Sequence, residues 1–292
     1  MKPVAFDYYR PESVTEAVVL LSEMRGDAAV LAGGMTLGPM LNLRMVRPRF
    51  VLDISRIESL KTISAGSRTV VTGACVVQAD ALRSQLVARE MPLLANALPW
   101  VGHFQTRNRG TLGGSVAHAD PSAEIPLSLV VCGGAVVLRS RRRERRVAAR
   151  DFFLGALTTQ RRPDELVTAL EWPRRSPHDG CAFAEIAQRH GDFAIAAAAC
   201  RLRLAAGGRL EDMSVGVGGV EDRPARIDTV QFIGSPAESI ACEVAEQAVG
   251  SVTAMEDHSA SADYRLALTR VLVERVVIGA VADAKRRRST LQ

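Results

Sequence analysis

Two glycine-rich segments limit most strongly how this chain can fold. The first is Ala32-Gly33-Gly34-Met35-Thr36-Leu37 and the second is Gly110-Thr111-Leu112-Gly113-Gly114-Ser115. In each segment, two adjacent glycines stand close to a hydroxyl residue. Adjacent glycines let backbone N–H groups turn toward one point and let a ligand approach the backbone closely. The segments therefore predict two loops that hold a pyrophosphate from opposite sides, and tight structural turns are the alternative interpretation.

Familiar nucleotide-binding and nucleophile motifs are missing. The first segment lacks the Gly-Lys-Ser/Thr ending of a P-loop. A third glycine-rich run, residues 216–221, has Glu221 where the dinucleotide fingerprint requires its last glycine. No Gly-x-Ser-x-Gly elbow is present. These observations argue against a P-loop protein, a Rossmann domain and an α/β-hydrolase.

The hydrophobic pattern predicts a small first unit that ends near residue 58. A capping box at Ser13–Glu16 starts a helix, and Gly26 closes it. Short apolar runs predict two strands, and a helix with Pro39 near its first turn lies between them. The strands are expected at 28–32 and 50–54, and the second helix at 37–43.

A second unit is expected from residue 59 to a polar, double-proline break at 172–177. It combines short strands with helices, and its arginine run forms the turn of a hairpin. Residues 105–122 have no hydrophobic period and predict a long functional loop. The other expected elements are strands at 62–64, 69–72, 135–138, 145–148 and 166–172, and helices at 78–86, 92–101 and 123–131.

Beyond the break, long strands precede two helices, an order typical of an α+β domain. The strands are expected at 182–187, 194–204 and 210–217, and the helices at 236–249 and 261–283. The predicted fold class is therefore α+β, with parts at residues 1–58, 59–175 and 178–292.

Cysteine usage indicates a reducing compartment. The five cysteines are scattered, and none forms a CxxC or a Cys/His cluster at metal-ligand spacing. No zinc or iron–sulfur centre is expected in this chain, and reduced thiols point to the cytoplasm. No apolar run is long enough to span a membrane, and the first residues contain no long apolar stretch of the kind a secretory signal has.

Positive charge is concentrated in two places. The net charge is +5, and much of the excess lies in the six arginines of residues 139–146 and in the tail at 285–288. A basic patch can bind nucleic acid. However, no aromatic residues interleave with these arginines, as stacking on single strands would require. A solvated hairpin and a frayed terminus are therefore the favoured interpretation.

Together, the two loops resemble those of the flavoprotein subunits of molybdenum hydroxylases, a family that includes the medium subunit of aerobic carbon monoxide dehydrogenase and the flavin domain of xanthine dehydrogenase. The matches keep their order and approximate spacing over essentially the whole chain. They are Phe6-Asp7-Tyr8, Pro11, residues 32–39 with Arg44, Gly73-Ala74, residues 109–117, Asp120-Pro121, Glu124-Ile125-Pro126 and residues 189–194.

The resemblance implies a two-subdomain FAD-binding fold of the vanillyl-alcohol oxidase type, followed by a C-terminal α+β domain. It places Gly33, Gly34, Met35 and Thr36 on one side of the FAD pyrophosphate, and Thr111, Gly113, Gly114 and Ser115 on the other. The full set implied to contact the cofactor is Ala32, Gly33, Gly34, Met35, Thr36, Leu37, Ala74, Gly110, Thr111, Gly113, Gly114, Ser115, Asp120, Glu124, Glu185 and Phe193.

Several of these positions have a second interpretation. Glu124 matches the acidic residue that binds ribose hydroxyls, a role that suits a carboxylate, but a helix N-terminal charge is the alternative. Phe193 aligns with an aromatic residue near the flavin ring, and core packing is its alternative. His103 and His118 lie near these segments and are interpreted as ordinary loop histidines.

Two departures from the family pattern affect the cofactor. Many relatives have two threonines where this chain has Val76-Val77, so one hydroxyl contact is expected to be absent. Relatives such as the carbon monoxide enzyme have lysine at the position of Glu185, close to the flavin ring. A carboxylate there should disfavour an anionic reduced flavin. The final electron acceptor therefore stays open.

The resemblance implies an electron-transfer role without a catalytic residue or metal in this chain. Such a subunit takes electrons from two [2Fe–2S] clusters of a small subunit, while a large subunit with a molybdenum–pterin centre hydroxylates the substrate. The expected assembly is a dimer of heterotrimers, without nucleic acid or a membrane span. The alternative is a stand-alone flavin oxidase or dehydrogenase of the vanillyl-alcohol oxidase type. It is disfavoured because the chain is short for such enzymes and has no evident His, Tyr or Arg cluster to activate a substrate.

Overall fold

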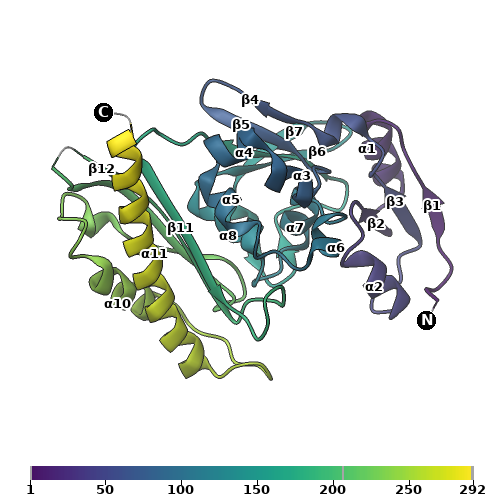
Figure 1. Ribbon diagram of the computed structural model, residues 1–292. Helices are drawn as coiled ribbons and strands as arrows, with labels where there is room; N and C mark the ends of the chain where they lie inside the picture. The colour runs from purple at the N-terminus through teal and green to yellow at the C-terminus, as the bar shows by residue number, and fades with distance from the viewer. Residues whose placement is uncertain (1, 206, 291–292) are drawn as a thin grey trace.

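The computed structural model describes residues 2–205 and 207–290, and three main β-sheets follow one another along the chain (Figure 1). The first is a parallel sheet in the order β1-β3-β2. Its elements are β1 (Asp7–Tyr9), α1 (Val14–Glu23), β2 (Ala28–Leu31), α2 (Leu37–Asn42) and β3 (Phe50–Asp53). Ser13 caps α1 as expected, because its hydroxyl accepts from the Glu16 N–H at 3.1 Å. The Glu16 carboxylate accepts from the Glu12 N–H rather than from that of Ser13.

The second sheet is antiparallel, in the order β4-β5-β10-β6-β7. Its centre is strand β10, where the buried Trp172 indole donates to the Thr72 hydroxyl at 3.1 Å. The strands are β4 (Ile63–Ala65), β5 (Thr69–Gly73), β6 (Ala135–Arg139), β7 (Glu144–Ala148) and β10 (Leu166–Pro173). The helices between them are η1 (Glu58–Lys61), α3 (Gln78–Arg83), α4 (Gln85–Glu90), α5 (Pro92–Ala97), α6 (Phe104–Arg107), α7 (Leu112–His118), α8 (Glu124–Val131) and α9 (Ala149–Phe152), and a small hairpin of β8 (Phe153–Gly155) and β9 (Thr158–Thr159) follows.

The third sheet is antiparallel, in the order β11-β12-β13-β14, and two helices cover one of its faces (Figure 1). The elements are β11 (Asp179–Ile186), β12 (Ala196–Leu204), β13 (Leu210–Gly218), β14 (Ala225–Ile227), η2 (Val230–Phe232), α10 (Ala241–Ser251) and α11 (Ala262–Thr290). The long helix α11 crosses β11 so closely that a Cβ atom on Gly180 would lie 2.0 Å from the Ala280 carbonyl oxygen. The other face packs on α5 and α8, where Leu93 and Leu127 meet Cys181 and Ala197. Among the described residues, no helix is long and apolar enough to cross a membrane.

The α+β prediction is confirmed, and the largest local error concerns residues 105–122. This segment is not a long loop, because it contains most of α6 and all of α7. Two glycines hide the helical pattern of α7, which is fixed by the Thr111 cap and by burial of Leu112 and Val116. The expected helix at 78–86 is also divided, because the Ser84 hydroxyl caps a new helix, α4.

Candidate cofactor-binding site

The first glycine-rich loop connects β2 to α2 and lies directly on the second. A Cβ atom on Gly33 would lie 2.1 Å from the carbonyl oxygen of Arg109 and 2.9 Å from Cα of Gly110. Only a residue without a side chain allows this approach. Gly34 follows with φ of +74°, a left-handed conformation that favours glycine. The structure therefore brings together two loops that are distant in sequence.

A third segment, which follows β5, packs against the second loop and forms hydrogen bonds with it. The N–H groups of Leu112 and Gly113 donate to the carbonyl oxygens of Val76 and Ala74, at 2.9 and 3.0 Å. A Cβ atom on Gly113 would lie 2.5 Å from Cα of Ala74. Ala74 thus fixes the start of α7, and the predicted residues of all three segments form one junction.

The two loops differ in the hydrogen-bond donors that they leave available. The described residues accept no hydrogen bond from the N–H groups of Gly33, Gly34, Met35 and Thr36. In the second loop, by contrast, the N–H of Gly114 donates to the Thr111 hydroxyl at 3.0 Å, and those of Leu112 and Gly113 are also bonded. The first loop therefore offers mainly backbone donors, and the second offers the hydroxyls of Thr111 and Ser115 at a helix N-terminus. This donor set fits a phosphate group.

Glu124 is the first residue of α8 and is buried, with 7% of its surface exposed. Burial raises its pKa to about 7; its own backbone N–H and Arg107 act in the opposite direction, and Asp120 adds to the rise. Asp120 also shapes the turn before α8, because its carboxylate accepts from the Ser122 N–H at 2.9 Å. Both carboxyl groups are close enough to interact electrostatically.

Glu185 and Phe193 come from the third sheet. Glu185 lies on β11 with 5% of its surface exposed, and neither of its carboxylate oxygens has a hydrogen-bond partner in the described chain. Phe193 lies in the loop between β11 and β12 and is 71% exposed, so the core-packing alternative is wrong. Its ring lines a hollow of about 210 Å³ together with Ser122 and Arg265.

Three residues near the junction have roles that the sequence did not indicate. Gln78 is buried at the start of α3, its N–H donates to the Gly110 carbonyl at 2.8 Å, and its side-chain oxygen has no partner in the described chain. Arg109 supplies the backbone that contacts Gly33. His103 packs against Gly191, where a Cβ atom would lie 2.7 Å from the imidazole ring. Each role depends on tertiary contact, so no local pattern could have revealed it.

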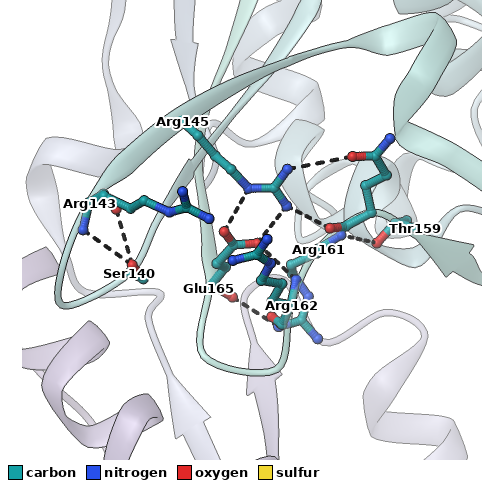
Figure 2. A network of polar contacts seen from close by, with 8 residues as sticks. Ser140, Arg143, Arg145, Thr159, Arg161, Arg162 and Glu165 are labelled. Carbon is teal, nitrogen blue, oxygen red and sulfur yellow. Dashed lines mark hydrogen bonds and ion pairs between the residues drawn. The ribbon is translucent and has the colours of Figure 1, made fainter.

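The arginine-rich hairpin lies on β6 and β7, and part of its charge is neutralised within the fold (Figure 2). Arg145 forms two hydrogen bonds to the buried carboxylate of Glu165, at 2.7 and 2.8 Å. It also donates to the Gln160 carbonyl at 2.6 Å. Arg146 pairs with Glu171. These contacts favour a structural role for the base of the hairpin.

Comparison with known proteins covers nearly the whole chain. Residues 4–175 match the family described as FAD binding domain in molybdopterin dehydrogenase, and residues 181–280 match the CO dehydrogenase flavoprotein C-terminal domain. The chain is 33% identical over 288 residues to the 6-hydroxypseudooxynicotine dehydrogenase complex subunit alpha of Paenarthrobacter nicotinovorans, a match that covers 98% of this chain and 97% of the relative. It is also 33% identical to the carbon monoxide dehydrogenase medium chain of Afipia carboxidovorans, covering 98% and 100%.

The fold also agrees with that of a solved structure over nearly the whole chain. Carbon monoxide dehydrogenase from Hydrogenophaga pseudoflava superimposes with a TM-score of 0.93 at 33% identity, over 97% of this chain and 99% of that chain. The predicted order of an FAD-binding fold followed by a C-terminal α+β domain is thereby confirmed, and so is FAD as the cofactor.

Proposed function

The chain belongs to the family of FAD-binding medium subunits of molybdenum hydroxylases, and from this membership we propose that it is the part of such a complex that moves electrons. It takes electrons from [2Fe–2S] clusters of an iron–sulfur small subunit and passes them to an external acceptor. The organic substrate is hydroxylated in a molybdenum-binding large subunit. The observation that carries this proposal is the junction of the two glycine loops, whose unbonded donors fit a pyrophosphate.

The proposed FAD site uses the junction as its phosphate-binding centre. The N–H groups of the first loop face the phosphates, and the Thr111 and Ser115 hydroxyls complete the donor set. Glu124 accepts from ribose hydroxyls, and Glu185 and Phe193 lie toward the flavin ring. The flanking positions of the proposed site are Ala32, Leu37, Ala74, Gly110, Gly113, Gly114 and Asp120. Bound flavin supplies the ability to accept single electrons and release two, and these residues hold and orient it.

The proposed assembly is a dimer of heterotrimers. The relatives are named as a complex subunit alpha and a medium chain, which supports partner chains for this one as well. Among the described residues, no group of three or more His, Cys, Asp or Glu side chains is arranged to hold a metal ion. The five cysteines are free thiols, which supports a cytoplasmic location.

The three sheets support the proposed division into parts at 1–58, 59–175 and 178–292. All the strands of each sheet lie within one of these three ranges. Hydrophobic clusters nevertheless join the parts, since Leu166 packs with the core of the first sheet. The parts therefore stabilise one another and need not be stable when separated.

The test compares the full chain alone with the chain co-expressed with candidate iron–sulfur and molybdenum subunits. The isolated chain should carry FAD, identified by chromatography after heat release, and should not oxidise organic substrates. In the complex, adding a hydroxylatable substrate without oxygen should bleach the flavin absorbance. The matched control is the complex with its molybdenum subunit omitted, in which the flavin should stay oxidised. Substrate turnover by the isolated, iron-free chain would instead establish the stand-alone flavin oxidase.

A further inference from the structure

Glu185 is a buried acid without a partner in its own chain. It stands opposite Ala197 in the β11–β12 pairing, and 5% of its surface is exposed. Neither carboxylate oxygen forms a hydrogen bond with a described residue. Leaving a buried polar group unpaired costs free energy, so such groups in native proteins have a partner. Both carboxyl oxygens of Glu185 are therefore available to a group from outside the described chain.

A second acid, Glu124 on α8, acts on Glu185 from the neighbouring part of the fold. Burial raises the pKa of Glu185 to about 8, and the negative charge of Glu124 adds to this rise. The other charged groups that act on the pair are Asp120 and Arg107, and both act through Glu124. The described residues offer no metal-binding group that would hold the two acids together as ligands. In the part of the chain that the structure describes, Arg107 thus acts on Glu124, and no cation acts directly on Glu185.

We propose that these two acids act on FAD as an unequal pair, in which Glu185 is a neutral carboxyl that donates a hydrogen bond to the cofactor and Glu124 is a carboxylate that accepts from its hydroxyl groups. This inference rests on the proposed function, because it requires FAD at the junction. It assigns the proton of the pair to one residue. The negative charge that the sequence predicts at Glu185 is accordingly absent near neutral pH.

The order of ionisation supports this division of roles. Glu124 has a pKa of about 7 and Glu185 a pKa of about 8. The backbone N–H of Glu124 and the charge of Arg107 favour the ionised form of Glu124, whereas no hydrogen bond from a described residue favours ionisation of Glu185. The charge of Glu124 also opposes ionisation of Glu185. When the environments of two acids separate their pKa values, the acid that keeps its proton acts as a donor and the ionised acid acts as an acceptor.

The experiment measures FAD affinity of the full chain, freed of flavin, by fluorescence titration from about pH 6 to pH 9. Affinity should rise as Glu124 ionises and should fall by up to about tenfold per pH unit as Glu185 ionises at higher pH. Glu185→Gln keeps a donor but cannot ionise, so the fall at high pH should disappear. Glu124→Gln should remove the rise at low pH. The matched control is Glu211→Gln, an exposed carboxylate on β13 of the same sheet, which should leave both limbs unchanged.

A second measurement does not depend on any variant folding. Infrared spectra of the wild-type chain should contain a protonated-carboxyl band that titrates near pH 8, and Glu185→Gln, if folded, should lack it. A flat affinity profile, a high-pH fall that persists in Glu185→Gln, or no such infrared band would overturn the inference while FAD binding stands. If FAD does not bind at any pH, the proposed function fails with it.

Discussion

Gly33 and Arg109 belong to different glycine-rich loops, yet a Cβ atom on Gly33 would lie 2.1 Å from the Arg109 carbonyl oxygen. The contact is between backbones, so no change of side-chain rotamer could relieve a clash there. Gly33 therefore has a second role in addition to its N–H group, which donates to no described residue. It sets the separation between the two loops that form the proposed pyrophosphate site.

We expect Gly33→Ala to push the loops apart and to remove most of the bound FAD. The free energy of unfolding should fall by about 1–3 kcal/mol, the usual cost of overpacking. Gly250→Ala is the matched control, because Gly250 lies in α10 with open space around it and should gain up to about 1 kcal/mol. Flavin content per chain and urea denaturation measure both effects. Unchanged flavin content in Gly33→Ala would contradict this role.

Thr111 should matter both to α7 and to the cofactor. Its hydroxyl accepts from the Gly114 N–H, and its own O–H remains free to donate to a phosphate. Thr111→Ala should cost about 1 kcal/mol of stability through loss of the cap and should weaken FAD binding as well. Thr111→Ser retains the hydroxyl and should bind FAD nearly as the wild type does. Equal FAD dissociation constants for the Ala and Ser variants would exclude the phosphate contact.

Local signals in the sequence were sufficient to predict helix α1 and the two glycine-rich loops. The Ser13 capping box predicted α1 because the cap and its partner are three residues apart. The paired glycines marked the loops because the absence of a side chain is a property of the residue itself. Both signals act over a few residues, and tertiary structure did not override them.

The features that sequence reasoning missed depend on distant contacts. Helix α7 contains two glycines and gained its stability from Ala74, which lies in another segment. The strand containing Glu185 was predicted, but its burial against α5 and α8 was not, because packing between sheets decides which face is covered. The exposure of Phe193 could not be predicted for the same reason.

The Arg145–Glu165 pair should make stability depend on pH (Figure 2). Burial alone would raise the pKa of Glu165, but hydrogen bonds from Arg145 and the Arg162 N–H outweigh it, so the folded-state pKa lies below its usual value. The stabilisation is therefore complete above the unfolded-state pKa and is lost as the pH falls through the folded-state pKa.

Glu165→Gln should accordingly lower the free energy of unfolding at pH 7 by about 3 kcal/mol, the low end for breaking a buried pair. The difference from the wild type should shrink as the pH is lowered. Glu144→Gln, an exposed change in the same hairpin, should stay within about 0.5 kcal/mol. Urea denaturation at several pH values gives all three results. A Glu165→Gln deficit that does not change with pH would rule out the ion pair as its cause.

Arg265 should hold the segment that presents Phe193. Its guanidinium is buried near the start of α11 and donates to the carbonyl oxygens of Ile195 and Gly219, each at 2.5 Å, and it pairs with Asp257 at 2.8 Å. An ammonium group cannot reproduce this planar arrangement of donors. Arg265→Lys should therefore lose about 3 kcal/mol of stability, because buried acceptors are left unpaired.

The consequence for Phe193 distinguishes a local role from general destabilisation. Hydrogen exchange in residues 187–195 should increase in Arg265→Lys more than in the strands of the second sheet, because the Ile195 carbonyl is released at the end of that loop. Arg270→Lys is the matched control on the same helix, since Arg270 is exposed and pairs with Glu246 at 2.8 Å. It should change stability by less than about 0.5 kcal/mol and leave exchange in the loop unaltered. If exchange in Arg265→Lys increases equally in residues 187–195 and in the second sheet, Arg265 stabilises the whole fold rather than the Phe193 loop.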